Sequence, residues 1–451
     1  SRIQQGLRVD PTTGQCIDPS NGCVPVNLLG AGNLNAAGAD FIRVAPLTNT
    51  TQREQKLASA FITGAPFASW AGPVDVALGL EWRSDSVDFV ADPSLTNGDA
   101  LGYLADASIS GKERVWEIYG EAIVPLLQDA AYARYLGLEM GYRYSDYDNA
   151  GSVDSWKVGG QWEVVDGVRF RSVLQRSVRA PNLAEAFQEQ ITSPGNFVGQ
   201  NTVTDPCSAS ADPQANGNAE RCIAQGIPAN QIGIYEATPF FPANFITGGN
   251  PNLTPETADT FTLGVILTPD WAPKWQFAID YFDLEITDTI GEANPAAICF
   301  DPANTGDLFC DRITRDPATY NVIEVFGPTS NRGLSAVEGI DTQISYATDL
   351  PGWLAIGNQN ADLQVNLIWT HLLNKTVQDN PVSTPLDCTG RFGWPCDEAR
   401  TGETFPNDRI FTNFLYGSGN LDVNLSWRWI GGSDNAAPLG LVNFGIVDPE
   451  L

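Results

Sequence analysis

The sequence is poor in basic residues, in histidine and in long apolar runs. Each of these shortages excludes or disfavours a class of function. It has 25 Lys and Arg against 54 Asp and Glu, a formal net charge of −29. Nucleic acid is therefore not an expected partner, because phosphate binding needs a basic face. His371 is the only histidine. We therefore expect neither a Ser-His-Asp triad nor a zinc site. No apolar run reaches the ~18 residues of a transmembrane helix.

Signatures of common enzymes are missing as well. There is no Gly-x-Ser-x-Gly elbow and no P-loop. Carboxylate pairs such as Asp146/Asp148 leave a glycosidase-like pair open, and the segment Asp301–Asp307 leaves a weak calcium loop open, although its ligand order does not fit an EF-hand. We interpret most of these carboxylates as solvated surface charge. We predict a protein that is not an enzyme and that uses no cofactor and no metal.

The cysteines fall into four close couples, each among Gly, Pro, Asn and Asp residues that are typical of loops. The couples are Cys16/Cys23, Cys207/Cys222, Cys299/Cys310 and Cys388/Cys396. Their spacing is not the Cys-x-x-Cys of zinc sites. We therefore predict disulfides, and with them an oxidising compartment.

Apolar and polar residues alternate with period two along most of the chain, which predicts strands with one apolar and one polar face. The clearest examples run from Val74 to Arg83 and from Leu421 to Trp429. We expect about twelve strands, near 53–64, 73–88, 113–126, 131–148, 153–165, 167–180, 257–269, 274–288, 334–348, 360–375, 407–416 and 420–430. Short helices are expected only in loops, around Ala296–Ile298 and Leu308–Thr314.

The connections between these strands alternate in length. Tight turns are expected at 127–130, 166–167, 269–273 and 417–419, and long connections at 89–112, 181–256, 289–333 and 376–406. One connection, 149–152, is short where a long one is due. Short turns on one rim and long loops on the other are typical of an outer-membrane barrel.

A soluble antiparallel sandwich also fits the alternation, but three features favour a barrel. Many strands reach 13 residues or more, enough to cross a bilayer at a tilt of ~45°. The apolar faces carry Trp and Tyr near strand ends, as aromatic girdles do. The polar faces carry too many ions for a packed core. We expect the lipid face to include Trp82, Trp275, Ile279, Leu425 and Trp427, and the lumen face Glu81, Glu121, Glu139, Lys157, Arg169 and Asp280.

Two motifs resemble those of TonB-dependent receptors. The segment Arg176-Ser-Val-Arg-Ala-Pro-Asn182 is similar to the strand end of that family, which carries Arg179, Ala180, Pro181 and Asn182 here. The segment Gly249-Asn-Pro-Asn-Leu-Thr-Pro-Glu256 is similar to the start of the family's next strand, with Gly249, Asn250, Pro251, Asn252, Pro255 and Glu256. Physically, Pro181 ends a strand and Asn residues cap turns. Arg176 and Arg179 are three apart, so on a regular strand they lie on opposite faces.

The resemblance implies a barrel of about 22 strands, closed by an N-terminal plug, that imports a scarce nutrient. With about twelve strands and no visible plug, we expect the chain to be a partial, antiparallel up-and-down transmembrane β-barrel, an all-β fragment of a bacterial outer-membrane protein. The implied partners are outer-membrane lipid, the TonB complex through the plug, and a siderophore, cobalamin-like or saccharide ligand. A passive pore, an adhesin and a secreted carbohydrate-active β-protein stay open as alternatives.

The whole chain, 1–451, is taken as barrel region. Residues 1–52 are expected to form an extracellular loop, 53–430 the strands and their loops, and 431–451 a truncated loop. Long ordered loops on a rigid scaffold usually carry function. We therefore place ligand capture in the longest connection, in the loop from Leu183 to Thr254, which contains the aromatic residues Tyr235, Phe240, Phe241 and Phe245. Packing against neighbouring loops is an equally weighted role for these aromatics.

Overall fold

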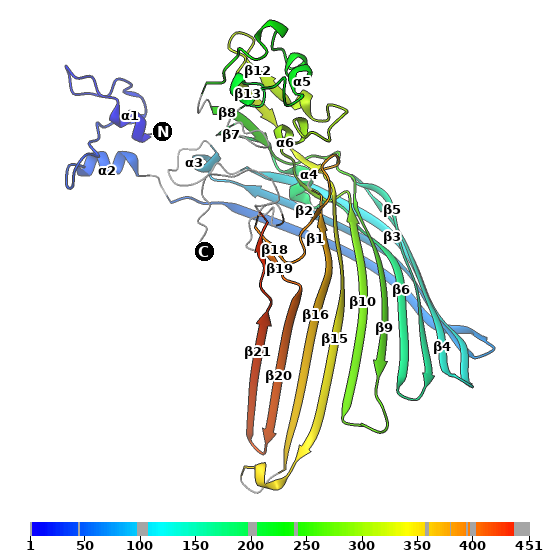
Figure 1. Cartoon of the computed structure of the whole chain (residues 1–451). Helices are drawn as coiled ribbons and strands as arrows, with labels where there is room; N and C mark the ends of the chain where they lie inside the picture. The colour runs from blue at the N-terminus through cyan, green and yellow to red at the C-terminus, as the bar shows by residue number, and fades with distance from the viewer. Residues whose placement is uncertain are drawn as a thin grey trace.

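One large antiparallel sheet dominates the computed structural model, which describes residues 2–43, 46–96, 107–196, 205–238, 242–356, 360–378, 380–393, 396 and 403–436. Figure 1 shows the sheet as a tall curved wall. Its strands are β1 (Thr50–Ser69), β2 (Gly72–Val90), β3 (Ile109–Ala130), β4 (Ala133–Tyr147), β5 (Gly151–Val165), β6 (Val168–Arg179), β9 (Glu256–Leu267), β10 (Trp275–Thr287), β15 (Leu334–Leu350), β16 (Ala361–Val377), β20 (Asp408–Ser418) and β21 (Leu421–Ile430).

The order of these strands in the sheet is their order along the chain, and each pairs antiparallel with the next. A thirteenth, short strand, β17 (Leu386–Asp387), pairs with the end of β16. Every strand range expected from the alternation overlaps one strand of the path. Among the described residues, β1 pairs only with β2 and β21 only with β20, so these two strands form the open edges of the wall.

The two faces of the wall differ sharply, as the register shows. One row across seven strands, from β6 to β21, contains Phe170, Val265, Ile279, Thr342, Trp369, Ile410 and Trp429. The neighbouring row on the opposite face contains Arg171, Gly264, Asp280, Asp341, Thr370 and Arg409. Because successive side chains of a strand point to opposite faces, one face is apolar and the other polar along the same strands.

Exposure identifies the apolar face as the lipid face. Leu80 on β2 is 55% exposed, and its partner Ile118 on β3 is 54% exposed. Glu117, the preceding residue of β3, points to the opposite face and is only 6% exposed. Glu117 accepts hydrogen bonds from Arg143 at 2.8 Å and from Ser145 at 2.6 Å. Carboxylates are therefore paired inside the curve of the wall, while large apolar side chains project outward.

The lipid face ends at an aromatic girdle below the long-loop rim. The rings of Trp82 and Trp116 lie 6.1 Å apart on paired positions of β2 and β3. Beyond Trp82 the outward positions of β2 are Ser84, Ser86 and Asp88, which are polar. The strands therefore continue past the bilayer boundary into water, as barrels with aromatic girdles do.

A glycine on the lumen face makes room for a long-range ion pair. Arg171 on β6 donates to both carboxylate oxygens of Asp280 on β10, at 2.8 and 2.7 Å, across the intervening strand β9. The residue between them is Gly264, where a Cβ atom would overlap the Asp280 carboxylate. Without a side chain at that position, the pair links strands that are not hydrogen-bonded to each other.

Turns and loops are segregated between the two rims. The turns at 70–71, 131–132, 166–167, 268–274 and 419–420 join strands at one rim. The long connections leave from the other rim, where they carry most of the helices and short strands (Figure 1). The connection at 148–150, between β4 and β5, is short on that rim. The N-terminal segment holds α1 (Arg2–Leu7), η1 (Ser20–Gly22) and α2 (Ala36–Ile42), and α3 (Pro93–Thr96) follows β2.

Within the described ranges, none of the helices has the length and apolar content needed to span a bilayer. The helices expected in loops are present as α6 (Pro295–Cys299) and η4 (Cys310–Arg312).

A charge placed in the lipid face should destabilise the wall according to its depth. We expect Leu78→Arg to lower the free energy of unfolding of the full-length protein by ~2–4 kcal/mol, because Leu78 projects from the middle of β2. Ser86→Arg, on the same face but beyond the Trp82–Trp116 pair, should cost about 0–1 kcal/mol. Denaturant titration in lipid vesicles measures both. Equal costs at the two positions would contradict the assignment of the girdle.

Candidate functional site at the mouth of the wall

The first motif ends β6 and turns the chain toward the inside of the wall. Pro181 follows the strand directly, and Asn182 then caps α4 (Leu183–Phe187). The Asn182 side chain accepts from the backbone N–H groups of Ala184 and Glu185, both at 2.9 Å. Glu185 returns the interaction by accepting from the N–H of Asn182 at 2.7 Å. This capping box starts a helix immediately after the strand.

Arg179, the last residue of β6, joins this helix to the next long strand. Its guanidinium donates to Glu256 at 2.7 and 2.8 Å and to Glu185 at 2.9 and 3.1 Å. Glu256 belongs to the second motif and begins β9, 77 residues further along the chain. Arg176 instead pairs with Asp259 at 2.8 Å on the opposite face, which confirms that the two arginines of the motif point apart.

The second motif packs against the first through its backbone. Gly249 donates to the carbonyl of Gln188 at 2.9 Å, and a Cβ atom there would lie 2.6 Å from the Gln188 nitrogen. Asn250 donates from its backbone to the carbonyl of Glu185 at 2.8 Å and from its side chain to that of Thr329 at 3.0 Å. Its side-chain oxygen also accepts from Asn252 at 2.9 Å. Glycine and asparagine are therefore required by close approach and by turn hydrogen bonds.

Two long loops fold together into one body above the mouth, which we call the cap. It comprises the described parts of 191–248 and of 290–331, and it contains a four-stranded sheet in the order β12 (Ile313–Arg315), β13 (Val322–Phe326), β8 (Pro242–Thr247), β7 (Ile191–Asn196). The parallel pair β13–β8 joins the two loops. The cap also holds η2 (Ala209–Ala211), α5 (Ala219–Ala224), η3 (Ala229–Gln231), and the pair β11 (Ile290–Glu292) and β14 (Thr329–Asn331) at its base.

The cap has its own hydrophobic core around two disulfides. Cys207–Cys222 and Cys299–Cys310 are bonded and nearly inaccessible, one from each loop. Around them pack Ile227, Ile232, Tyr235, Ala243, Ala296, Phe300, Ile313, Val322 and Val325. Each disulfide restricts its own loop in the unfolded chain, by ~3 kcal/mol for a loop of about 15 residues in the chain-entropy model. The shared apolar core then holds the loops together.

A buried ion pair crosses the cap. Arg315 on β12 donates to both carboxylate oxygens of Asp205, at 2.5 and 2.9 Å, and their side chains are 3% and 5% exposed. The hydroxyl of Tyr235 donates to the same carboxylate at 3.2 Å. Burial raises the pKa of Tyr235, and the nearby Asp205 carboxylate adds to this. The tyrosine therefore stays protonated and serves the buried pair as a hydrogen-bond donor.

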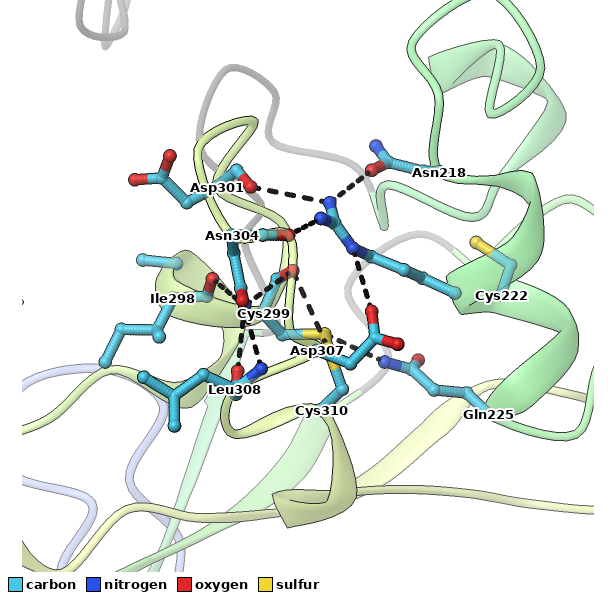
Figure 2. The surroundings of a disulfide bond; sticks show 12 residues. Asn218, Cys222, Gln225, Ile298, Cys299, Asp301, Asn304, Asp307, Leu308 and Cys310 are labelled. Atoms are coloured by element: carbon cyan, nitrogen blue, oxygen red, sulfur yellow. Dashed lines mark hydrogen bonds and ion pairs between the residues drawn. A yellow bond between two sulfur atoms is a disulfide. The ribbon is translucent and has the colours of Figure 1, made fainter. Parts of the chain in front are cut away.

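The loop at 301–307, which left a calcium site open, is filled by an arginine of the other loop. Arg221 donates to the carbonyl oxygens of Asp301, at 3.4 Å, and of Asn304, and it pairs with the Asp307 carboxylate at 3.3 Å. The Asn304 amide, fully buried, bonds the carbonyls of Ile298 and Leu308 (Figure 2). Two backbone carbonyls of this loop and the Asp307 carboxylate therefore surround the Arg221 guanidinium.

Two of the four aromatic residues assigned to ligand capture belong to the described part of the chain. Tyr235 is 6% exposed and lies in the cap core, and Phe245 packs against that core from β8. Phe240 and Phe241 lie outside the described residues. Asp205, Arg315 and Arg221 were missed by sequence reasoning. Their partners lie about 80 to 110 residues away in the chain, so no local pattern marks them.

All the disulfides belong to the long-loop side of the chain. Cys16–Cys23 closes a turn in the N-terminal segment, and Cys388–Cys396 lies in the connection between β16 and β20. The latter connection also carries β18 (Arg391–Phe392) and β19 (Thr404–Phe405), which form a small sheet with β22 (Asp434–Asn435). Along the antiparallel path, six strands (β1 to β6) separate the first disulfide from the second, and two strands separate each later disulfide from the one before it. An even number of strands returns the chain to the same rim, so all four disulfides lie on the long-loop rim.

Comparisons with known proteins identify a matching family and several structures with a similar fold. A family model described as TonB dependent receptor-like, beta-barrel, matches residues 27–440. A structure of the ferric enterobactin receptor PfeA of Pseudomonas aeruginosa, a point mutant in complex with enterobactin, is 16% identical with a TM-score of 0.50, and the match covers 84% of this chain and 42% of that chain.

A second PfeA mutant from the same organism also has 16% identity and a TM-score of 0.50, over 84% and 41% of the two chains. The siderophore receptor PirA of Acinetobacter baumannii is 15% identical over 85% and 44%, with a TM-score of 0.48. This chain thus spans less than half the length of these structures. No curated protein matches it.

Removing one partner of the buried pair should loosen the cap. We expect Arg315→Met to destabilise the cap by ~3–5 kcal/mol, because Asp205 would remain buried and uncompensated. Arg134→Met is the control, since Arg134 makes an exposed pair with Asp166 on the opposite rim. Hydrogen exchange of 205–238 and 313–326 in the full-length protein should accelerate only in the first variant. Unaltered exchange there would contradict the role of the pair.

The Arg179 network should require the forked guanidinium. Arg179→Lys keeps the charge but cannot donate to two carboxylates in pairs. We expect amide exchange at 185–190 and 249–256 to rise by about 3- to 10-fold, a modest effect because these charge-assisted bonds are partly solvated. Arg176→Lys, which alters the single Asp259 pair on the other face, should leave these amides unchanged. If both variants behave alike, Arg179 does not hold the two motifs together.

Proposed function

This chain belongs to the TonB-dependent receptor β-barrel family, and we propose that the whole protein imports a scarce nutrient through the outer membrane with energy supplied by TonB. The family is one of outer-membrane receptors and transporters rather than of enzymes. Because the chain spans less than half of the structures that it resembles, the activity, ligand and partners of the whole protein are proposals.

The observation that carries the proposal is the contrast between the wall and its mouth. The inner face of the wall is lined with paired charges, such as Arg171–Asp280 and Lys157–Glu139, which suits a hydrated passage. The mouth is covered by an ordered cap, and its base is joined to the second motif by hydrogen bonds from Ile290 to Glu256 and from Asn250 to Thr329. Ordered loops of this size on a rigid scaffold are typical of ligand recognition.

For the ligand, we propose a ferric siderophore as the first class to test, with cobalamin-like and saccharide ligands as alternatives. One structure with a similar fold is a ferric enterobactin receptor in complex with enterobactin, which supports testing this ligand class first. Ligand contact by Phe240 and Phe241 belongs to the same proposal. Tyr235 and Phe245 pack within the cap, so their contribution would be to its shape.

The proposed arrangement places residues 53–430 as wall and loops, and residues 1–52 and 431–451 on the outer side. Residues 437–451 lie outside the described part of the chain. The energy-coupling partner would be the TonB complex, reached through a plug domain in the whole protein. Outer-membrane lipid would contact the apolar face that carries Leu80 and Ile118.

Transport can be tested in cells that express the full-length protein. We expect uptake of radioactive iron from at least one member of a siderophore panel, with uptake lost when either this protein or TonB is deleted. Uptake that persists without TonB would indicate a passive pore. Binding of cells to surfaces with no uptake of iron, cobalamin or saccharide would indicate an adhesin, and either result would overturn the proposal.

A further inference from the structure

A cleft of about 840 Å³ lies on the inner side of the wall beneath the first motif. Its floor is formed by inward-facing residues of β1, β2 and β3, among them Arg53, Arg83 and Val87, and its roof by the chain from Ala180 to Ala184. Tyr147, at the end of β4, lines one side. The cleft is part of the wall and of the motif, separate from the cap core.

The sequence creates this cleft by folding α4 inward. After Pro181 and the Asn182 cap, the short helix crosses from β6 to β3, where Phe187 lies directly over Gly111. Any side chain at Gly111 would overlap the Phe187 ring. Ser108 accepts from the N–H of Glu189 at 3.0 Å and fixes the end of this crossing. The roof is therefore attached at both ends, with open space between roof and floor.

Each charged side chain that lines the cleft has an ion-pair or hydrogen-bond partner, with one exception. Asp85 accepts from Arg83 at 3.0 Å and from Gln55 at 2.8 Å, and Glu113 accepts from Asn149 at 2.6 Å. Arg179 is occupied by its two carboxylates. Among the described residues, no carboxylate lies within ion-pairing distance of Arg53, although the chain carries a large excess of acidic residues. Arg53 is thus the one charged side chain of the lining for which the described residues supply no partner.

The remaining surface of the cleft is largely apolar. Val87 is 8% exposed, and Ile109, Pro181 and Leu183 also line the space. A guanidinium prefers planar oxyanions, which it binds with two parallel hydrogen bonds. Sites for small molecules combine such a polar anchor with apolar walls. We propose that the cleft binds a small amphipathic molecule that bears a carboxylate, with Arg53 as its anchor and the apolar residues around Val87 and Leu183 as the seat of its body.

As a step in import, this site rests on the proposed function, but its binding chemistry does not. It can be measured with the full-length protein in lipid nanodiscs, with no energy source. The probes are 2-naphthoate and the neutral 2-naphthalenemethanol, followed by ligand-observed NMR. We expect naphthoate to bind more tightly than the alcohol, and its affinity to fall with added salt.

Three variants test the assignment. Arg53→Gln should weaken naphthoate about 10- to 100-fold, the effect of losing a charge-assisted hydrogen bond, while binding of the alcohol stays unchanged. Leu183→Trp should weaken both probes by filling the space. Arg428→Gln is the matched control, since Arg428 lies on β21, away from the residues that line the cleft, and it should change neither affinity.

Equal binding of naphthoate to the wild-type protein and to Arg53→Gln would overturn the proposal, as would an equal loss in Arg428→Gln. These outcomes are independent of transport. If nanodisc binding behaves as expected while cells take up nothing, the proposed function fails and the site remains. If uptake is normal while Arg53→Gln leaves the affinity for naphthoate unchanged, the proposed site is wrong and the proposed function remains.

Discussion

A strand that crosses a bilayer has to pair all its backbone polar groups and still present apolar side chains to lipid, and the wall depends on meeting both demands at once. The register meets them with two interleaved rows, one from Phe170 to Trp429 and one from Arg171 to Arg409. A slip of one residue would exchange these faces. Such a slip would expose Asp280 to lipid and place Ile279 inside, so the side chains also fix the register.

Side chains on the polar face can form ion pairs between strands that are not adjacent, which the apolar side chains of the lipid face cannot do. Inside the wall, charged side chains form pairs that reach beyond adjacent strands, as Arg171 does over Gly264 to Asp280. Such pairs brace the curvature without apolar packing, which a wide hydrated lumen cannot supply. Arg53 differs from these paired residues, because no carboxylate among the described residues forms an ion pair with it.

The mouth is organised by contacts between segments far apart in sequence. Arg179 connects the end of one long loop to its beginning, and the two loops above share a core, a parallel strand pair and the Asp205–Arg315 bridge. The aromatic content that suggested ligand capture is explained, for Tyr235 and Phe245, by this core. Disulfides stiffen each loop separately, whereas the ion pair and the Arg221 contacts join one loop to the other.

The sequence alone determined the wall, because period-two alternation is a local property and each strand carries it, from Val74–Arg83 to Leu421–Trp429. It also determined the disulfide couples and the opposite faces of Arg176 and Arg179, which follow from spacing along one segment. Only the tertiary structure decided the cap, the Arg221 contacts and the cleft. Arg315 pairs with Asp205, which lies 110 residues away in the chain. Phe187, in the helix that follows β6, packs over Gly111 on β3. Such pairings depend on how distant segments meet in space, and no residue carries that information by itself.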